Sequence, residues 1–380
     1  MRMLNKLLAG GAVVATVAAL SAGPALADPP KGVTPAPGSV VSAGAQTTEY
    51  VSDALSTAWD SKFPSKTKIY SWDALNARGV DNSIAFKSGC QKFLRPNGAS
   101  PGIAALSAGA GGTTKGHPCL DVARSSRAPK STDPTNLSFI GFGLDNVTYA
   151  SLAKGSNAPH NLTITDLNEI YTCSVTNWDK FPGGKNAPIK PLLAQAGAGT
   201  VTFFLNAIGV TTPGPCVDEP GTLEENEGVN PIFKNNKDAI IPFSAGDWVA
   251  QAYHSAKCLN TSCSFVNGVT CKPKTGQNKY GCDLNGVLGL NDINGTSPVK
   301  GTGSKTVLNP PASAAKGGFT NAFVRNLYDV VRGTKTIPKY LTQFFGPKGW
   351  YCTNPTTLKD YGFEPATVKG FPSCGSITAG

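Results

Sequence analysis

The residues best suited to hold a small anion lie in a loop of small side chains at residues 194–200, Ala-Gln-Ala-Gly-Ala-Gly-Thr. A short apolar stretch precedes this loop, and Thr200 opens the apolar run that follows it. Gly197 and Gly199 carry no Cβ atom, so a ligand can approach the backbone there. A helix that begins at such a loop presents free N–H groups and the positive end of its dipole. The pattern predicts an anion-binding loop; the alternative is an ordinary strand-to-helix turn.

Three further polar loops could take part in the same chemistry. Thr47 and Thr48 stand before a predicted helix, and residues 95–102, with Ser100, stand before another. The third loop reads Arg-Ser-Ser-Arg at residues 124–127, at the end of a predicted strand. Two guanidinium groups can hold an oxyanion through paired hydrogen bonds, although a solvated loop can have the same composition.

A serine hydrolase is the enzymatic alternative. Gly98, Ser100 and Gly102 fit the turn that exposes a nucleophilic serine between a strand and a helix. In such enzymes the N–H after the serine stabilises the oxyanion, but here that residue is Pro101, which has no N–H. His254 follows in the required order, but a histidine on a predicted helix is more typical of a surface or packed position. We therefore expect a binding protein, not an enzyme.

Alternating strands and helices would position these loops. Apolar residues at i, i+3, i+4 and i+7 from Val51 predict a helix that Thr47 or Thr48 caps. Thr163 and Asp166 have capping-box spacing. Further helices are predicted at residues 162–171 and 245–256, the second capped by Ser244, and strands at residues 68–72, 120–127 and 239–243. The alternation favours an α/β architecture.

The first 27 residues are predicted to be a secretory signal that is cut before Asp28. They contain Arg2 and Lys6, a short apolar run, and a small-residue cleavage pattern. The first cysteine is Cys90, so a lipid anchor at the cleavage point is not expected. Removing these two cations lowers the formal charge from +10 to +8, and no Lys/Arg run of the nucleic-acid-binding type occurs. We expect an exported protein, periplasmic or extracellular, with no nucleic-acid partner.

Ten cysteines follow the signal, and an oxidising compartment favours disulfides. Zinc is the alternative, but there is no Cys-x-x-Cys pattern and only three histidines, so no metal site is predicted. Sequence alone does not fix the connectivity. Neighbouring cysteines suggest Cys90–Cys119, Cys173–Cys216, Cys258–Cys263, Cys271–Cys282 and Cys352–Cys374.

The order of these loops resembles that of the phosphate-type solute-binding proteins of bacterial ABC importers. Two further segments are similar to that family, "LTITDLNEIYTCSVTNW" at residues 162–178 and "IIPFSAGDWVAQ" at residues 240–251. The resemblance implies a two-lobed α/β fold of the type II periplasmic-binding-protein kind, with a ligand cleft between the lobes. It implies capture of an inorganic oxyanion, phosphate first, for an ABC permease, with no cofactor, by a monomer. The implied ligand residues are Thr47, Thr48, Ser100, Arg124, Ser125, Ser126, Arg127, Gly199 and Thr200.

The same resemblance implies an organisation in which the chain leaves the first lobe and returns to it. The crossing strand is expected at residues 138–144 and the return within the Pro-, Gly- and Ser-rich residues 301–318. The expected parts are a signal at residues 1–27, a first lobe at 28–138 and 318–380, and a second lobe at 139–317 with a Cys-rich excursion at 258–282.

The 194–200 loop departs from the family pattern Arg-x-Asp-Gly-Ser-Gly-Thr. Ala194, Ala196 and Ala198 replace the Arg, the Asp and the ligand hydroxyl, and Ser126 stands where the family's phosphate-selecting Asp is expected. Loss of that carboxylate would blur the distinction between phosphate and sulfate, and Arg124 or Arg127 could supply the missing charge. The alternative function is an exported protein of the same fold that binds wall polymers or a partner instead of an anion.

Overall fold

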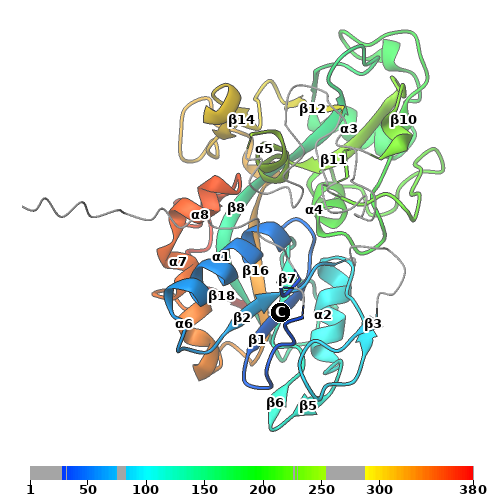
Figure 1. Cartoon of the computed structure of the whole chain (residues 1–380). Coiled ribbons are helices and arrows are strands. Elements are labelled where there is room, and N and C mark those ends of the chain that lie inside the picture. The colour runs from blue at the N-terminus through cyan, green and yellow to red at the C-terminus, as the bar shows by residue number, and fades with distance from the viewer. Residues whose placement is uncertain are drawn as a thin grey trace, which may run out of the picture.

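One mixed β-sheet runs through the computed structural model, which describes residues 28–30, 32–74, 83–225, 227–228, 230–253 and 287–379. Its central strand is β8 (Leu137–Leu152), which is buried from its first residue to Ser151. The main strand order is β10-β11-β8-β16-β7-β1-β2, and β12, β17 and β18 also pair with β8. The sheet therefore extends through two groups of elements, which Figure 1 shows above and below the middle of β8. We call the lower group the first lobe and the upper group the second lobe.

The first lobe contains the parallel strands β1 (Val40–Gly44), β2 (Ile69–Ser71) and β7 (Val122–Ser125). Helices α1 (Glu49–Lys62) and α2 (Ala99–Ser107) pack on them. A Cβ on Gly102 would lie 2.9 Å from Gly44 Cα, so glycine at both positions lets α2 lie close to the sheet. Because β1 and β7 run in parallel, the loops that follow them emerge at the same edge.

Short strands and helices complete the first lobe. They are β3 (Ser83–Ile84), β4 (Phe93–Leu94), β5 (Thr113–Thr114), β6 (His117–Pro118), α6 (Thr342–Phe345), α7 (Trp350–Thr353), α8 (Pro355–Asp360), β17 (Glu364–Pro365) and β18 (Ile377–Ala379).

The second lobe packs around Trp178, Tyr171 and Phe204, which are fully buried. Its larger elements are α3 (Ile164–Tyr171), α4 (Gly199–Ala207), β11 (Ala239–Ser244) and α5 (Ala245–Tyr253). Its shorter strands are β9 (Asn161–Leu162), β10 (Lys190–Pro191), β12 (Leu288–Leu290), β13 (Asp292–Ile293), β14 (Val299–Lys300) and β15 (Val307–Leu308).

The lobes are connected by β8 and by β16 (Val324–Arg332), which pair antiparallel along their length. The register shifts between Leu327, opposite Gly143, and Tyr328, opposite Gly141, so Phe142 has no partner in β16. The predicted crossing at residues 138–144 lies within β8. The predicted return at residues 301–318 is wrong, because β16 returns the chain. Residues 301–318 contain part of the β14–β15 pair and two prolines, which cannot donate ladder hydrogen bonds. The proposed lobe boundaries stay a prediction.

The helix starts confirm most of the expected local chemistry. At α3 both hydrogen bonds of the Thr163–Asp166 capping box are present, and Ser244 Oγ accepts from the Asp247 N–H before α5. The prediction of a threonine side-chain cap on α1 is wrong. Thr48 occupies the N-cap position, but its φ of −108° and ψ of 4° leave the extended conformation of a capping residue, and its side chain makes no cap bond.

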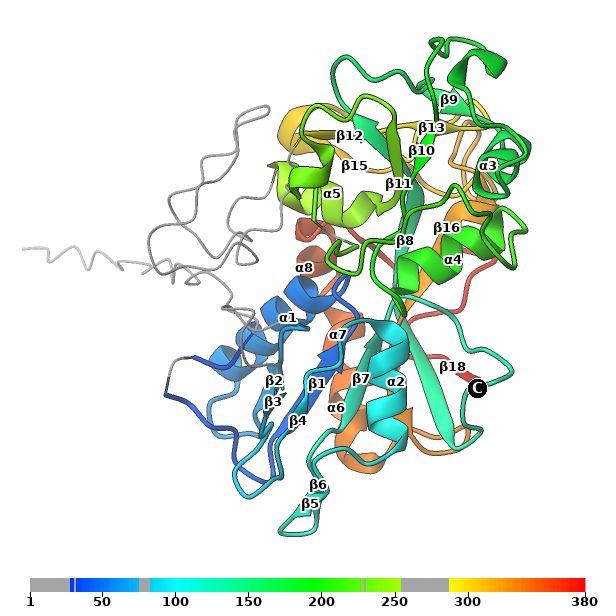
Figure 2. The same ribbon diagram turned by 90° about the vertical axis from the view of Figure 1, so that its right-hand side faces the viewer.

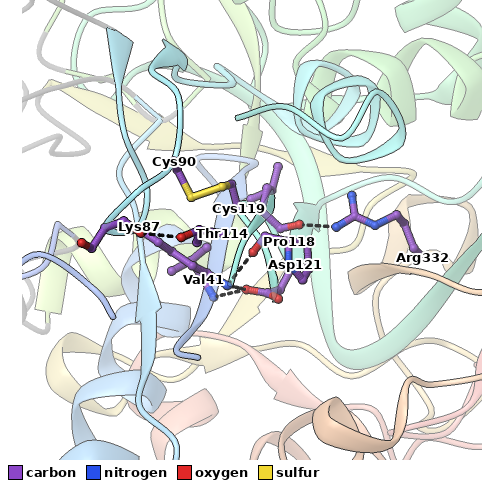
Figure 3. The surroundings of a disulfide bond; sticks show 10 residues. Val41, Lys87, Cys90, Thr114, Pro118, Cys119, Asp121 and Arg332 are labelled. Atoms are coloured by element: carbon purple, nitrogen blue, oxygen red, sulfur yellow. Dashed lines mark hydrogen bonds and ion pairs between the residues drawn. A yellow bond between two sulfur atoms is a disulfide. The ribbon is translucent and has the colours of Figure 1, made fainter. Parts of the chain in front are cut away.

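Three of the five predicted disulfides are present: Cys90–Cys119, Cys173–Cys216 and Cys352–Cys374. Cys258, Cys263, Cys271 and Cys282 lie outside the described residues, as do the predicted signal and the Cys-rich excursion. Figure 3 shows Cys90–Cys119 beside a buried ion pair in which Lys87 Nζ lies 2.6 Å from Asp121 Oδ2. In the described part of the chain, no helix has the length and apolar character needed to cross a membrane.

Candidate functional site

The N-termini of α1, α2 and α4 converge where the two lobes meet. Figure 2 shows α1 and α2 below this region and α4 above it. Thr47 Oγ1 lies 3.3 Å from Thr200 Oγ1, and the Ser100 N–H donates to the Gly197 carbonyl over 3.2 Å. We call this region the junction and define it by Thr47, Thr48, Ser100, Ser126, Thr200 and Arg325. Loops far apart in the sequence therefore come together here.

Glycine makes the close approach of the lobes possible. Gly197 has a φ of +84°, and a Cβ there would lie 2.9 Å from Pro101 Cδ. A Cβ on Gly199 would collide with Ser126 Oγ. The sequence predicted that these glycines admit a ligand; in the structure they admit the opposite lobe.

Arg325 is the junction residue that the sequence analysis missed. It is 3% exposed, and its guanidinium donates to the Ser126 carbonyl and to Thr200 Oγ1, both over 3.0 Å. Asp145, opposite it on β8, holds it through hydrogen bonds from Nε (3.0 Å) and Nη2 (2.7 Å). Burial raises the pKa of Asp145, and the Arg325 charge opposes that shift. The available signal was a lone arginine within the largely apolar stretch at residues 323–331.

Two buried hydroxyl groups at the junction lack a partner. Thr48 Oγ1 and Ser126 Oγ have no hydrogen bond to any group in the described part of the chain. Both residues are fully buried. Buried polar groups are nearly always hydrogen-bonded, and an unsatisfied one opposes folding. These two hydroxyls are the junction groups whose hydrogen bonding is incomplete among the described residues.

In the polar loop at the end of β7, Arg127 and Ser125 have different roles. Arg127 Nε donates to Ser100 Oγ over 3.0 Å, and the rest of its guanidinium forms a paired contact with Asp133 at 2.7 and 2.8 Å. Burial opposes the charge of Asp133, but the hydrogen bonds from Arg127 and the Lys130 N–H, together with the charges of both residues, outweigh it and lower the pKa of that carboxyl. Ser125 Oγ donates to the Arg127 carbonyl, so it shapes the loop.

The hydrolase alternative gains no support from the geometry of Ser100. Its hydroxyl accepts from a guanidinium, which stays protonated and cannot act as a base. Pro101 lies within the first turn of α2 and provides no N–H. His254 lies outside the described residues.

Arg124 makes its described contacts within the first lobe. Its guanidinium donates to Ser71 Oγ over 2.7 Å and to the Ala45 carbonyl over 3.2 Å. Nη2 lies 3.8 Å from Glu49 Oε2 and has no hydrogen-bond partner among the described residues. Burial lowers the pKa of Arg124, while Glu49 raises it. The structure thus brings Arg127 to the junction by a direct contact, whereas Arg124 supports the loop before α1.

An acidic segment of the second lobe also reaches the junction, and the sequence analysis did not single it out. Glu225 Oε2 accepts from the Thr200 N–H over 2.9 Å. Glu224 accepts from Gln46 Nε2 (2.7 Å) and Asn97 Nδ2 (3.2 Å) of the first lobe. Gln195 joins them by donating to both amide oxygens; we call Gln46, Asn97, Gln195 and Glu224 the amide cluster. Burial raises the pKa of Glu224 to about 7, although the two amide donors lower it.

A metal centre is not indicated by the described residues, because nowhere in them do three His, Cys, Asp or Glu side chains gather as metal ligands. The junction offers hydroxyls, backbone N–H groups and the guanidinium groups of Arg325 and Arg127, together with carboxylates. Donors of this kind suit an oxyanion better than a cation.

A family comparison decides the class of the protein. The model of the PBP superfamily domain matches residues 34–257. The chain belongs to the PBP superfamily. Within this superfamily, the predicted fold class, a two-lobed α/β periplasmic-binding-protein fold, is confirmed. Among curated proteins, none matches the sequence.

Solved structures place the chain near phosphate receptors in fold. The chain is similar to an ABC-type phosphate transport receptor from Vibrio cholerae, with 14% identity and a TM-score of 0.52 over 86% of this chain and 99% of that chain. It is also similar to a protein from Clostridium perfringens described as a phosphate ABC transporter substrate-binding protein with bound phosphate. That match has 15% identity and a TM-score of 0.52 over 86% and 99% of the two chains. At this identity the likeness concerns the fold, and the resemblance stated from the sequence is confirmed at that level.

Proposed function

We propose that this PBP superfamily member binds an inorganic oxyanion, most suitably phosphate, at the junction of its lobes. The observation that carries the proposal is the pair of unpartnered buried hydroxyls, Thr48 and Ser126; the Arg325 guanidinium donates to the carbonyl of Ser126. Three helix N-termini meet there, and their N–H groups and dipoles favour negative charge. Arg325 contributes directed donors more than net charge, because Asp145 balances its charge.

Export and uptake are part of the proposal. The three disulfides favour an oxidising compartment outside the cytoplasm. The structurally similar proteins are a phosphate transport receptor and a phosphate transporter substrate-binding protein, which supports delivery to an ABC permease. The predicted signal cleavage before Asp28 and the predicted monomer belong to the same proposal. Binding without chemistry is the expected activity, because Ser100 has no base beside it among the described residues.

Calorimetric titration with phosphate, then sulfate, tests this function. The disulfide-intact protein is first unfolded and refolded to remove any bound anion. Ser126→Ala removes a hydroxyl that has no described partner, so we expect weaker phosphate binding, about tenfold or more, with little change in stability. Ser138→Ala is the matched control. Ser138 is equally buried, on β8, where it donates to the Gly333 carbonyl, so the control should lose stability and keep its affinity. The absence of binding to either anion would overturn the proposal.

A second function has two observations in its favour. The Glu225 carboxylate already holds the Thr200 N–H, and Ala194 stands where the related receptors are expected to carry an arginine. A protein that retains the fold and binds a wall polymer or a partner would need no free anion site. The same titration separates the two functions.

A further inference from the structure

We propose that Glu225 is an internal competitor for the oxyanion, a carboxylate of the chain itself that occupies the anion position at the N-terminus of α4. This inference rests on the proposed function, since it concerns the same site. It states what a phosphate ion must displace to bind there.

The contact is made at the donors that an anion would use. Glu225 is fully buried, and its Oε2 accepts from the Thr200 N–H, which lies in the first turn of the nine-residue α4. First-turn N–H groups have no partner within their own helix, so the carboxylate supplies what the helix lacks. A carboxylate is the group that a helix N-terminus stabilises.

A second observation points to a ligand at the same place. Ser126 Oγ is buried, has no described partner and lies against α4, since a Cβ on Gly199 would collide with it. Glu225 Oε1 is likewise buried without a described partner. Glu225 Oε2 therefore satisfies the Thr200 N–H but leaves the neighbouring Ser126 hydroxyl without a partner among the described residues. A tetrahedral oxyanion has more acceptor oxygens than a carboxylate and could accept from both donors.

The adjacent residue fixes the competitor in place. Glu224 accepts hydrogen bonds from Gln46 and Asn97, which belong to the first lobe. Glu225 itself contacts the second lobe through Thr200. The acidic segment is thus held by both lobes, and the Glu225 carboxylate lies at the N-terminus of α4.

Competition lowers the apparent affinity for the oxyanion. The Thr200 N–H cannot serve two anions, and two negative groups at one buried site repel each other strongly. Phosphate binds only those molecules in which Glu225 has left α4. The observed dissociation constant for phosphate is therefore the intrinsic constant divided by the fraction of such molecules. A glutamine keeps the shape and an acceptor oxygen but not the charge, so Glu225→Gln should bind phosphate about tenfold more tightly or better.

Two measurements on the full protein test the inference. The first is amide hydrogen exchange without any anion. The Thr200 N–H should exchange slowly in the wild type and faster in Glu225→Ala, while Glu219→Ala, an exposed residue of the same segment, should match the wild type. The second is calorimetry with inorganic phosphate on the wild type, Glu225→Gln and Glu219→Gln.

The outcomes distinguish this inference from the proposed function. Faster Thr200 exchange together with tighter phosphate binding by Glu225→Gln alone supports the competitor. Unchanged exchange in Glu225→Ala overturns it, whatever phosphate does. Phosphate binding by the wild type that Glu225→Gln leaves equal or weaker overturns the competitor and retains the receptor. If no variant binds phosphate although the Thr200 contact is demonstrated, the proposed function fails and the competitor role falls with it.

Discussion

Arg325 supplies the guanidinium of the junction from a strand and not from a loop. Its donors reach Ser126 of the first lobe and Thr200 of the second, and Asp145 fixes its plane from the neighbouring strand. A side chain held this way has little freedom to lose when a ligand arrives. This explains why the loop at residues 194–198 can consist of mostly small, uncharged side chains: the guanidinium that the loop lacks is supplied by Arg325 on β16.

The buried carboxyl group of Asp329 predicts how the stability of the folded protein depends on pH. Asp329 lies in the first lobe without a hydrogen bond to any described residue, and burial raises its pKa to about 8, although Arg124 lowers it. The unfolded chain has the ordinary value of 3.8, so the folded protein retains a proton that the unfolded chain has released. Stability therefore falls as pH rises from about 4 to about 8, by about 1.4 kcal/mol per unit for this group.

Asp329→Asn should remove this dependence. We expect the variant to be about 5 kcal/mol more stable than the wild type at pH 7.5, since the dependence acts over the range from pH 3.8 to 7.5, and to approach it near pH 4. Denaturant unfolding at several pH values measures the difference. Asp179→Asn, which changes a carboxylate on the surface, is the control and should leave the pH profile in place. A parallel shift of the Asp329→Asn curve at all pH values would contradict the assignment.

At the scale of elements, the sequence predicted those features that depend only on residues close together along the chain. The α3 capping box and the loop before Thr200 are local patterns, and both are where they were expected. Arg325 could not be found in this way, because its partner Asp145 lies 180 residues away and no spacing links them. Glu225 was missed for the same reason, since its role depends on a segment folding back onto α4.

The disulfide Cys173–Cys216 joins the end of α3 to the start of the acidic segment, residues 217–225, which contains Glu224 and Glu225. Cys173–Cys216 closes a chain separation of 43 residues, worth about 4 kcal/mol by the loop-entropy relation. Replacing both cysteines by alanine should lower the free energy of unfolding by up to that amount. It should also speed exchange of the Thr200 N–H, because the support of residues 217–225 is loosened.

Cys352–Cys374 provides the comparison for that experiment. It ties the tail to the first lobe with a separation of 22 residues. Its removal should destabilise the protein without altering exchange at Thr200. If the two double substitutions accelerate exchange of the Thr200 N–H equally, the faster exchange reflects global unfolding and not the local loosening of residues 217–225.

For the whole molecule, the distance between the lobes depends on Gly197. Its positive φ costs a substituted residue about 1–2 kcal/mol, and a Cβ would also press on Pro101 across the junction. Gly197→Ala should therefore separate the lobes. We expect a larger radius of gyration by small-angle scattering and phosphate affinity reduced about tenfold or more.

Gly183→Ala separates backbone strain from closure. Gly183 has a φ of +83°, nearly that of Gly197, but a Cβ there would meet nothing within 4 Å. This variant should lose similar stability while keeping the wild-type scattering profile and affinity. If both variants behave alike, the contact across the junction has no part in closing the molecule.

The shift in register between β8 and β16 marks a point at which we expect a hinge between the lobes. Phe142 has no partner in β16 there, and the flanking Gly141 and Gly143 carry no Cβ, so we expect the ladder between β8 and β16 to bend at this point. Because these two strands carry the chain between the lobes, we expect the lobes to swing about this hinge as rigid bodies. Under the proposed function, release of a captured ion would need this swing. Its residence time would then depend on the bending of two strands more than on the lifetime of any one hydrogen bond.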